Sequence, residues 1–369
     1  MIGAGLGLAL AVLAQAPTLA PRDTQLLVAF PPDLTAVDGE VLVRCALYGQ
    51  RHFERAFGRR ATTAWSSDTR AGPTQLPQIL RLSGFERLVA DTPATDSTHV
   101  LVVHRFGDRP LERSVSQLII AEMLAAMDTS PYPRAALEGA WRFDSLADTV
   151  AVLRDVAFAR LAVDLDTRGN GLPIVVFNPA SWVRSATVAV PLDSALRALG
   201  RGTGELRAMD AAQRATAAVR EGDSLRFIAR EVPPVGFKVF WLRTGRSVAG
   251  EGDTTNAHTA APPLLAQRVP RRPGLAGPSW SFVAIDATNV RVMALKRAEQ
   301  TSAKVLRLTE RSGAGATVTV TFGPRLARVR VANLLEDPLQ TLALSPDGRR
   351  VTLTLRPWDI VTLLFEEAR

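Results

Sequence analysis

The spacing of the apolar residues changes near residue 170, and this change limits the possible folds more than any other feature of the sequence. Before it, apolar residues recur at helical spacing between short strand-like runs; after it, they alternate with polar residues. Many short alternating runs with turn signals such as Ser345-Pro346-Asp347-Gly348 are typical of β-sandwich domains. Strands are predicted at residues 173–178, 185–191, 225–231, 237–242, 289–295, 304–310, 316–322, 326–333, 350–355 and 361–366.

The first third of the chain predicts alternating helices and strands. Helices are expected at residues 40–57 and 74–82, the second capped by Thr74 with Pro77 in its first turn, where a missing N–H costs little. Strand-like runs are residues 61–66, 88–90 and 100–104. Strands separated by helices of this length favour parallel βαβ units.

The remaining segments complete an α+β multidomain prediction. Residues 116–127, 134–141 and 145–165 are helical in pattern, and residues 243–279, rich in Gly, Pro, Thr and Arg, are expected to be a linker. The predicted order is a partial β/α N-terminal unit, a helical middle segment and C-terminal β-sandwich domains. The boundaries are 1–21 (apolar segment), 22–110 (β/α unit), 111–168 (helical), 169–242 (β domain), 243–279 (linker) and 280–369 (C-terminal β domain).

Composition excludes several classes of protein. The 44 Lys+Arg against 36 Asp+Glu give a net charge of +8, but the basic residues are scattered rather than clustered, so nucleic-acid binding is not expected. The single cysteine, Cys45, excludes an intramolecular disulfide and a Cys-rich zinc module, and its apolar context predicts a buried thiol. None of the four histidines stands in an H-x-D, H-x-H or H-E-x-x-H motif.

The N-terminal apolar run, residues 2–16, leaves two alternatives open. Ala14-Gln15-Ala16 resembles a signal-peptide cleavage site, which would make the protein secreted or periplasmic. No Lys or Arg precedes the run, so a helix in a cytoplasmic protein is the other alternative. At about 15 residues the run is shorter than the ~20 that a membrane-spanning helix needs, and no membrane span is predicted.

Asp68 is the first candidate for a catalytic group. It follows a predicted strand and Trp65, and catalytic groups of β/α proteins project from the carboxyl ends of strands. The same pattern is typical of a turn or a helix cap, so the residue type alone leaves both interpretations open.

Several ordered motifs together resemble the α-mannosidases of glycoside hydrolase family 38. In the first third, Trp65-Ser66-Ser67-Asp68 through Gly72, followed by Gln75-Leu76-Pro77-Gln78-Ile79-Leu80, is similar to the family's W-x-x-D-x-x-G turn and the helix after it. Further similar segments are 32–34, 39–53, 175–182, 232–237, 294–299, 333–336 and 355–360. The resemblance implies a barrel-like, seven-stranded form for the β/α unit, of which this chain carries a shortened part.

The resemblance also implies a site. Asp68 would be the nucleophile of a retaining reaction and a zinc ligand, and Trp65 a substrate contact. The acid/base group would be Asp91, Asp96 or Asp108, among which the sequence does not choose. The family's zinc site takes an H-x-D pair and the histidine of an F-H-D segment, whereas this chain has no H-x-D and carries Arg142-Phe143-Asp144 at the second place. Because a catalytic zinc site normally has three protein ligands, no stoichiometric zinc is expected.

Substitute zinc ligands are conceivable at two positions. His99 or His104 would serve only if an imidazole nitrogen lay about 2.0–2.1 Å from a metal that Asp68 also contacts. Trp182, Trp241 and Trp358 are expected to be core aromatics. Two functions therefore remain: an α-mannosidase-type hydrolase acting on α-linked mannose in glycans or oligosaccharides, or a non-catalytic carbohydrate-binding or structural remnant of that family. In either case the expected partner is a carbohydrate.

Overall fold

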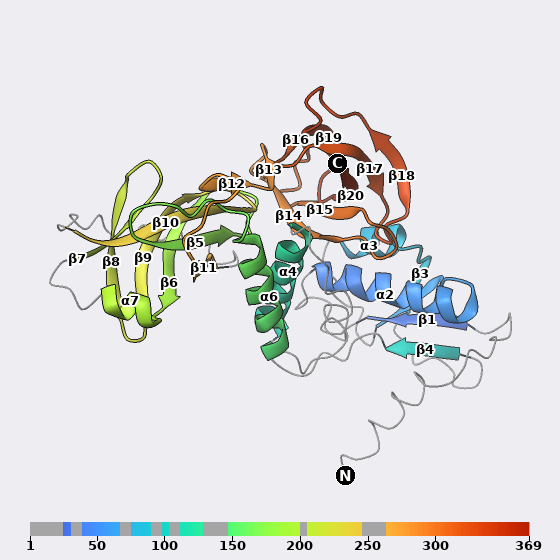
Figure 1. Ribbon diagram of the computed structural model, residues 1–369. Coiled ribbons are helices and arrows are strands. Elements are labelled where there is room, and N and C mark those ends of the chain that lie inside the picture. The colour runs from blue at the N-terminus through green and yellow to red at the C-terminus, as the bar shows by residue number, and fades with distance from the viewer. Residues whose placement is uncertain are drawn as a thin grey trace, which may run out of the picture. The chain divides into compact units, whose positions relative to one another are not determined.

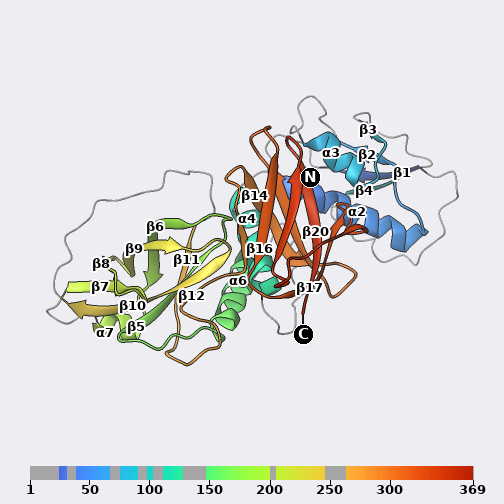
Figure 2. The same ribbon diagram turned by 90° about the horizontal axis from the view of Figure 1, so that it is seen from above.

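The computed structural model describes residues 25–30, 39–66, 75–89, 98–102, 111–127, 147–199, 205–245 and 263–368. Contacts within the chain divide it into two compact units. Unit 1 comprises Met1–Arg109, Arg142–Asp144 and Asn333–Leu335, and unit 2 comprises the remainder. Figures 1 and 2 label the helices and strands of each.

Unit 1 contains a parallel sheet of four strands, so the βαβ prediction is confirmed for its described residues. The elements are β1 (Gln25–Ala29), α2 (Gly39–Phe57), β2 (Thr63–Trp65), α3 (Leu76–Leu82), β3 (Arg87–Val89) and β4 (Thr98–Val102). The strand order is β3-β2-β1-β4, and every pairing in it is parallel. Figure 1 shows α2 running along this sheet. A seven-stranded barrel form remains a prediction.

The two helices of unit 1 follow their sequence signals closely. The apolar positions of α2 that predicted its inner face, including Val41, Cys45 and Phe53, are buried, and burial raises the pKa of the Cys45 thiol. Helix α3 begins with a proline in its first turn, as expected, because the missing N–H falls where no intrahelical bond is made. Its N-cap is Gln75, not the predicted Thr74, and no side chain caps it. Thr74 lies outside the described residues.

The buried side chain of Gln50 in α2 forms hydrogen bonds with the backbone just before β2 and just after α3. The Gln50 side-chain amide donates to the carbonyl oxygens of Ala61 and Ser83 at 2.8 and 2.9 Å, and its Oε1 accepts from Ala61 N at 2.8 Å. Gln50 is fully buried, so each of these bonds satisfies a backbone group that water does not reach. Gln50 thus fixes the approach to β2 and the exit from α3 against one helix.

Unit 2 begins with two helices and an eight-stranded antiparallel arrangement. The elements are α4 (Leu111–Met127), α6 (Ala147–Leu161), β5 (Leu172–Asn178), β6 (Arg184–Pro191), α7 (Ser194–Leu199), β7 (Glu205–Met209), β8 (Ala215–Glu221), β9 (Ser224–Val232), β10 (Gly236–Gly245), β11 (Leu265–Arg268) and β12 (Ser279–Ser281). The strand order is β11-β5-β10-β7-β8-β9-β6, with β12 also paired to β10. Helices α4 and α6 lie side by side, and Phe158 of α6 meets Phe237 of β10 edge to face at 5.9 Å.

The C-terminal part of unit 2 is a β-sandwich, as the alternating pattern predicted. Its strands are β13 (Val283–Ile285), β14 (Val290–Arg297), β15 (Lys304–Glu310), β16 (Ala316–Phe322), β17 (Leu326–Ala332), β18 (Pro338–Leu342), β19 (Arg350–Leu355) and β20 (Ile360–Glu367). Sheet β13-β16-β19 faces sheet β14-β15-β20-β17-β18 (Figure 2). The two inner faces meet through Phe322 and Phe365, whose ring centres are 5.0 Å apart.

Two kinds of contact stabilise buried lysine and glutamate side chains in unit 2. All three lysines of the chain are buried in ion pairs: Lys238 with Asp210, Lys296 with Glu299 and Glu336, and Lys304 with Glu367. Glu310 has hydrogen bonds in place of a cation, accepting from the Trp358 and Gly313 backbone N–H groups at 2.8 Å each, and from Ser312 and Asn289. Burial opposes ionisation of Glu310, but these hydrogen bonds outweigh it and lower its pKa to about 2.

The structure corrects the expected linker. Leu265–Arg268, inside residues 243–279, is strand β11 and pairs with β5, and β10 continues past residue 242 to Gly245. Strands β1, β7, β8, β12, β13 and β18 were not expected from the sequence. Residues 246–262 and the helix expected at 134–141 lie outside the described residues. Among the helices that are described, none has the length and hydropathy needed to cross a membrane.

Candidate active site

The candidate site lies at the carboxyl edge of the parallel sheet in unit 1. Here the chain leaves β1, β2 and β3, and backbone hydrogen bonds continue one step beyond the strands. Phe30 N donates to the Trp65 carbonyl oxygen at 2.7 Å, and Ser66 N donates to the Val89 carbonyl oxygen at 3.0 Å. Ligands of parallel α/β sheets bind just beyond this edge. The two hydrogen bonds therefore hold the carboxyl ends of β1, β2 and β3 together where a ligand is expected to bind.

Trp65 and Asp68 occupy different positions relative to this edge. Trp65 is the last residue of β2, pairs with Ala29 on one side and Val89 on the other, and is half-buried. Asp68 follows it by three residues and lies outside the described residues, as do Asp91, Asp96, Asp108 and His104. Because a hydrogen bond holds Ser66 at the edge of the sheet, the segment that carries Asp68 begins at this edge.

His99 is the one candidate substitute zinc ligand whose backbone is described. It is the second residue of β4 and pairs with Leu26, near the start of β1. The carboxyl edge is three residues further along β1, which corresponds to about 10 Å of strand. His99 thus lies toward the opposite edge of the sheet.

A buried ion pair at the start of α2 was not singled out from the sequence. Glu40, in the first turn of the helix, accepts from Arg44 Nε at 2.6 Å, and Arg44 Nη1 donates to the Tyr48 hydroxyl at 3.2 Å. Both charged side chains are fully buried. A carboxylate in the first helical turn is favoured by the helix dipole, and in a βα unit that end of the helix lies at the carboxyl edge. The four-residue spacing was the signal that could have revealed the pair.

The described residues do not fit a zinc site. Within them, no group of three His, Cys, Asp or Glu side chains lies close enough together to hold a metal ion. His52 is half-buried on α2 with its ring edge-on to Phe53 at 5.8 Å, a packing contact. No catalytic step is therefore derived through zinc, and the absence of stoichiometric zinc remains a prediction.

Two segments of the sequence match one enzyme family. Residues 30–94 match the profile described as "Glycosyl hydrolases family 38 N-terminal domain", a segment that begins directly after β1 and includes α2, β2, α3 and β3. Residues 289–363 match "Glycosyl hydrolases family 38 C-terminal beta sandwich domain". In these two segments the chain is similar to glycoside hydrolase family 38. They lie in its parallel-sheet unit and in its β-sandwich.

Individual proteins are also similar to this chain. The α-mannosidase G of Dictyostelium discoideum is 43% identical over 51 residues, a match that covers 14% of this chain and 5% of that protein. The crystal structure of an α-mannosidase from Enterococcus faecalis V583 superposes with a TM-score of 0.63 at 11% identity, covering 91% of this chain and 90% of that one. A second structure from E. faecalis, described as a protein in glycosyl hydrolase family 38, gives 0.62 with the same identity and coverage. At this identity the structural likeness shows the fold.

Proposed function

We propose that this protein is a retaining glycoside hydrolase that acts on α-linked mannose, with Asp68 as its nucleophile. The observation that carries the proposal is the hydrogen-bonded carboxyl edge, where Trp65 and Ser66 lead directly into the segment containing Asp68. This edge lies inside the residues that match the N-terminal domain of family 38. The α-mannosidases similar to this chain support mannose as the substrate sugar.

The strand order supports Asp91 as the acid/base partner. Retention requires two carboxyl groups about 5–5.5 Å apart. Val89, the last residue of β3, pairs directly with Trp65, the last residue of β2, on strands about 4.8 Å apart. In the sequence Asp91 follows Val89 by two residues and Asp68 follows Trp65 by three.

The other two candidates fit this geometry less well. Asp96 comes before β4 in the sequence, whereas Asp68 and Asp91 each come directly after a strand. Asp108 follows the last residue of β4 by six positions, and β4 is separated from β2 by β1, so those two strands are roughly 10 Å apart.

The reaction follows from these two roles. The Asp68 carboxylate attacks the anomeric carbon while the acid donates its proton to the glycosidic oxygen, so the first bond forms as the glycosidic bond breaks. The acid, now a carboxylate, takes a proton from water, and that water displaces Asp68 and releases mannose with retained configuration. Trp65, half-buried at the end of β2, is the aromatic side chain that we assign to contact with the sugar.

The second candidate is a non-catalytic carbohydrate-binding or structural protein. The sequence favours it, because the chain contains no H-x-D pair and so lacks the histidine ligands that the resemblance implies. In that case the carboxyl edge would bind a mannoside without cleaving it.

Turnover of an aryl α-mannoside by the full chain, with added zinc and with EDTA, tests the proposal. We expect measurable turnover that Asp68→Asn reduces to background and that Asp91→Asn reduces strongly for substrates with poor leaving groups. Asp96→Asn is the matched control and should retain activity. Absence of turnover under both conditions, or full activity of Asp68→Asn, would overturn the proposal. Binding of methyl α-mannoside without turnover would support the second candidate.

A further inference from the structure

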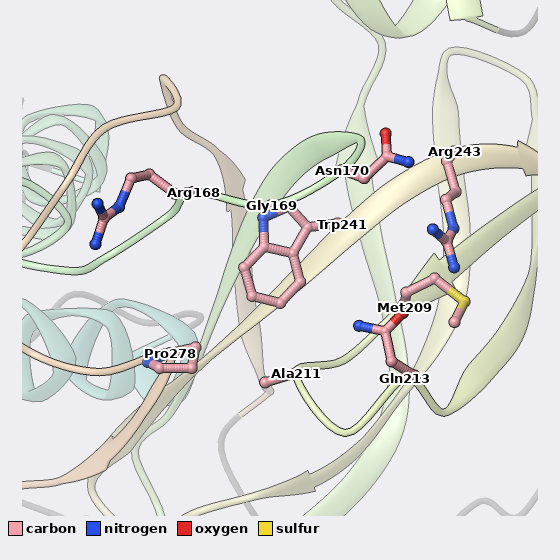
Figure 3. A pocket seen from close by; sticks show the side chains of 9 residues that line it. All are labelled: Arg168, Gly169, Asn170, Met209, Ala211, Gln213, Trp241, Arg243 and Pro278. Atoms are coloured by element: carbon pink, nitrogen blue, oxygen red, sulfur yellow. The ribbon is translucent and has the colours of Figure 1, made fainter.

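A cavity separate from the carboxyl edge lies within unit 2, on its eight-stranded sheet. It is a cavity of about 270 Å³ at strands β7 and β10, lined by Asn170, Met209, Gln213, Trp241 and Arg243 among others. Drug-sized ligand pockets occupy roughly 300–1,000 Å³, so this one has room for a single small ring. Figure 3 shows the Trp241 ring at its centre and the Arg243 guanidinium turned toward Met209 and Gln213.

One arginine of the cavity wall, Arg243 of β10, has no counterion among the described residues. Its cross-strand partner is Arg207 of β7, and each of the two has a buried Nε without a hydrogen-bond partner. The Arg207 guanidinium lies over Gly245, outside the cavity, whereas Arg243 is turned toward Met209 and Gln213 (Figure 3). Like charges directly opposite each other destabilise a sheet, and a buried polar group without a partner adds to that cost. An anion in the cavity would give Arg243 its missing partner.

The charged side chains described near the cavity provide no counterion for Arg243. Arg168, at the border of the cavity, already has a carboxylate partner, Asp166, at 2.5 Å. Figure 3 shows its guanidinium on the far side of Trp241 from Arg243. Glu205 lies on the same face of β7 and pairs with Gly245 in the register, but it forms no ion pair with either unpaired arginine.

The other groups in the cavity suit a hydroxylated ring. Gln213 and Asn170 carry amides that donate to and accept from hydroxyl groups, and Trp241, Met209 and Pro278 supply apolar surface. The walls are held in place: Trp241 Nε1 donates to the Thr167 carbonyl oxygen at 3.0 Å. Gln213, at a φ of 62°, closes a turn in which its N–H donates to Asp210 O at 3.0 Å.

We propose that this cavity binds a carboxylate-bearing sugar, such as a hexuronate, with its carboxylate on Arg243. A guanidinium group matches a carboxylate with paired N–H donors, and the amides would take the ring hydroxyls. The anion part of the inference stands on the unpaired Arg243 alone, and the choice of a sugar rests on the proposed function. The site is formed by strands and turns of unit 2 and uses none of the residues of the carboxyl edge.

Calorimetric titration of the full chain with sodium glucuronate tests the site, with glucose and sodium sulfate as comparison ligands. We expect glucuronate to bind, glucose to bind at least tenfold more weakly, and sulfate to be weaker than glucuronate because it cannot use the amides. Arg243→Gln should weaken glucuronate binding at least tenfold, and Arg207→Gln, which removes a charge outside the cavity, should weaken it less. Arg243→Lys should weaken it less, because it keeps the charge but loses the paired donors. Arg220→Gln, an exposed arginine on β8 of the same sheet, is the matched control and should bind like the wild type.

Three results would overturn the proposal: no binding of glucuronate to the wild type, equal binding of glucose or sulfate, or unchanged binding by Arg243→Gln. A thermal melt of each variant shows that it is folded before it is titrated. The mannoside assay separates this inference from the proposed function. Turnover without glucuronate binding would refute only the cavity assignment, and glucuronate binding without turnover would refute only the hydrolase.

Discussion

Replacing Gln50 by methionine tests how unit 1 is held together. Methionine keeps the length and most of the volume of the side chain but removes the amide. Three buried hydrogen bonds are lost, two to the backbone of Ala61 and one to Ser83, all between 2.8 and 2.9 Å. At about 1 kcal/mol net for each buried hydrogen bond, the expected loss is about 3 kcal/mol. Since every 1.4 kcal/mol is tenfold in an equilibrium constant, opening of this region should become roughly 100-fold more frequent.

Hydrogen–deuterium exchange followed by mass spectrometry measures this locally, which matters because a chain with two units need not unfold in one step. Peptides covering α2, β2 and α3 should exchange roughly 100-fold faster in Gln50→Met, whereas peptides from β5 to β16 in unit 2 should not change. Gln340→Met, an exposed glutamine on β18, is the matched control and should exchange like the wild type throughout. An increase of less than about threefold around Ala61 and Ser83 would refute the role given to the amide. An equal increase in both units would show that the substitution acts globally.

Three further predictions concern buried charged or reactive groups. Folding lowers the pKa of Glu310 from near 4.5 to about 2, so the contribution of Glu310 to stability is complete above pH 4.5 and is lost as the pH falls toward 2. In an acid titration followed by near-ultraviolet circular dichroism, Glu310→Gln should therefore unfold at a higher pH than the wild type. Lys296→Met leaves two buried carboxylates without their cation and should destabilise the sandwich by about 3–5 kcal/mol in denaturant titrations, and Lys304→Met, whose pair is partly exposed, by less. Cys45 should not react with a thiol reagent at pH 8 until denaturant is added, since burial raises its pKa; rapid reaction in the native protein would contradict its burial.

Local signals in the sequence located most of unit 1. Helix α2 could be predicted because its apolar residues recur every three to four positions and a glycine follows it, and α3 because Pro77 and Gly84 mark its two ends. Strand β11 could not, because its four residues are all half-buried and alternate little, and its place in the sheet comes from pairing with β5. An edge strand of this kind is defined by its partner rather than by its own pattern.

The same distinction applies to the two sites. The edge beside Asp68 follows from a motif within ten residues, and the pair of Glu40 and Arg44 is separated by one helical turn, so both carry a local signal. Arg207 and Arg243 are 36 positions apart, and nothing in either segment indicates that they meet. Only the antiparallel register of β7 and β10 brings them together.

That register is fixed by the opposite face of the same strands. Leu242 of β10 pairs with Ala208 of β7, and both belong to the buried core of the sheet. A slip of one residue would turn Leu242 outward and direct Arg243 into that core, and burying an unpaired guanidinium there is far more costly than exposing a leucine. The apolar face therefore sets the pairing, and the pairing places Arg243 opposite Arg207 and Trp241 opposite Met209. The cavity on one face of the sheet is thus specified by the residues packed on the other.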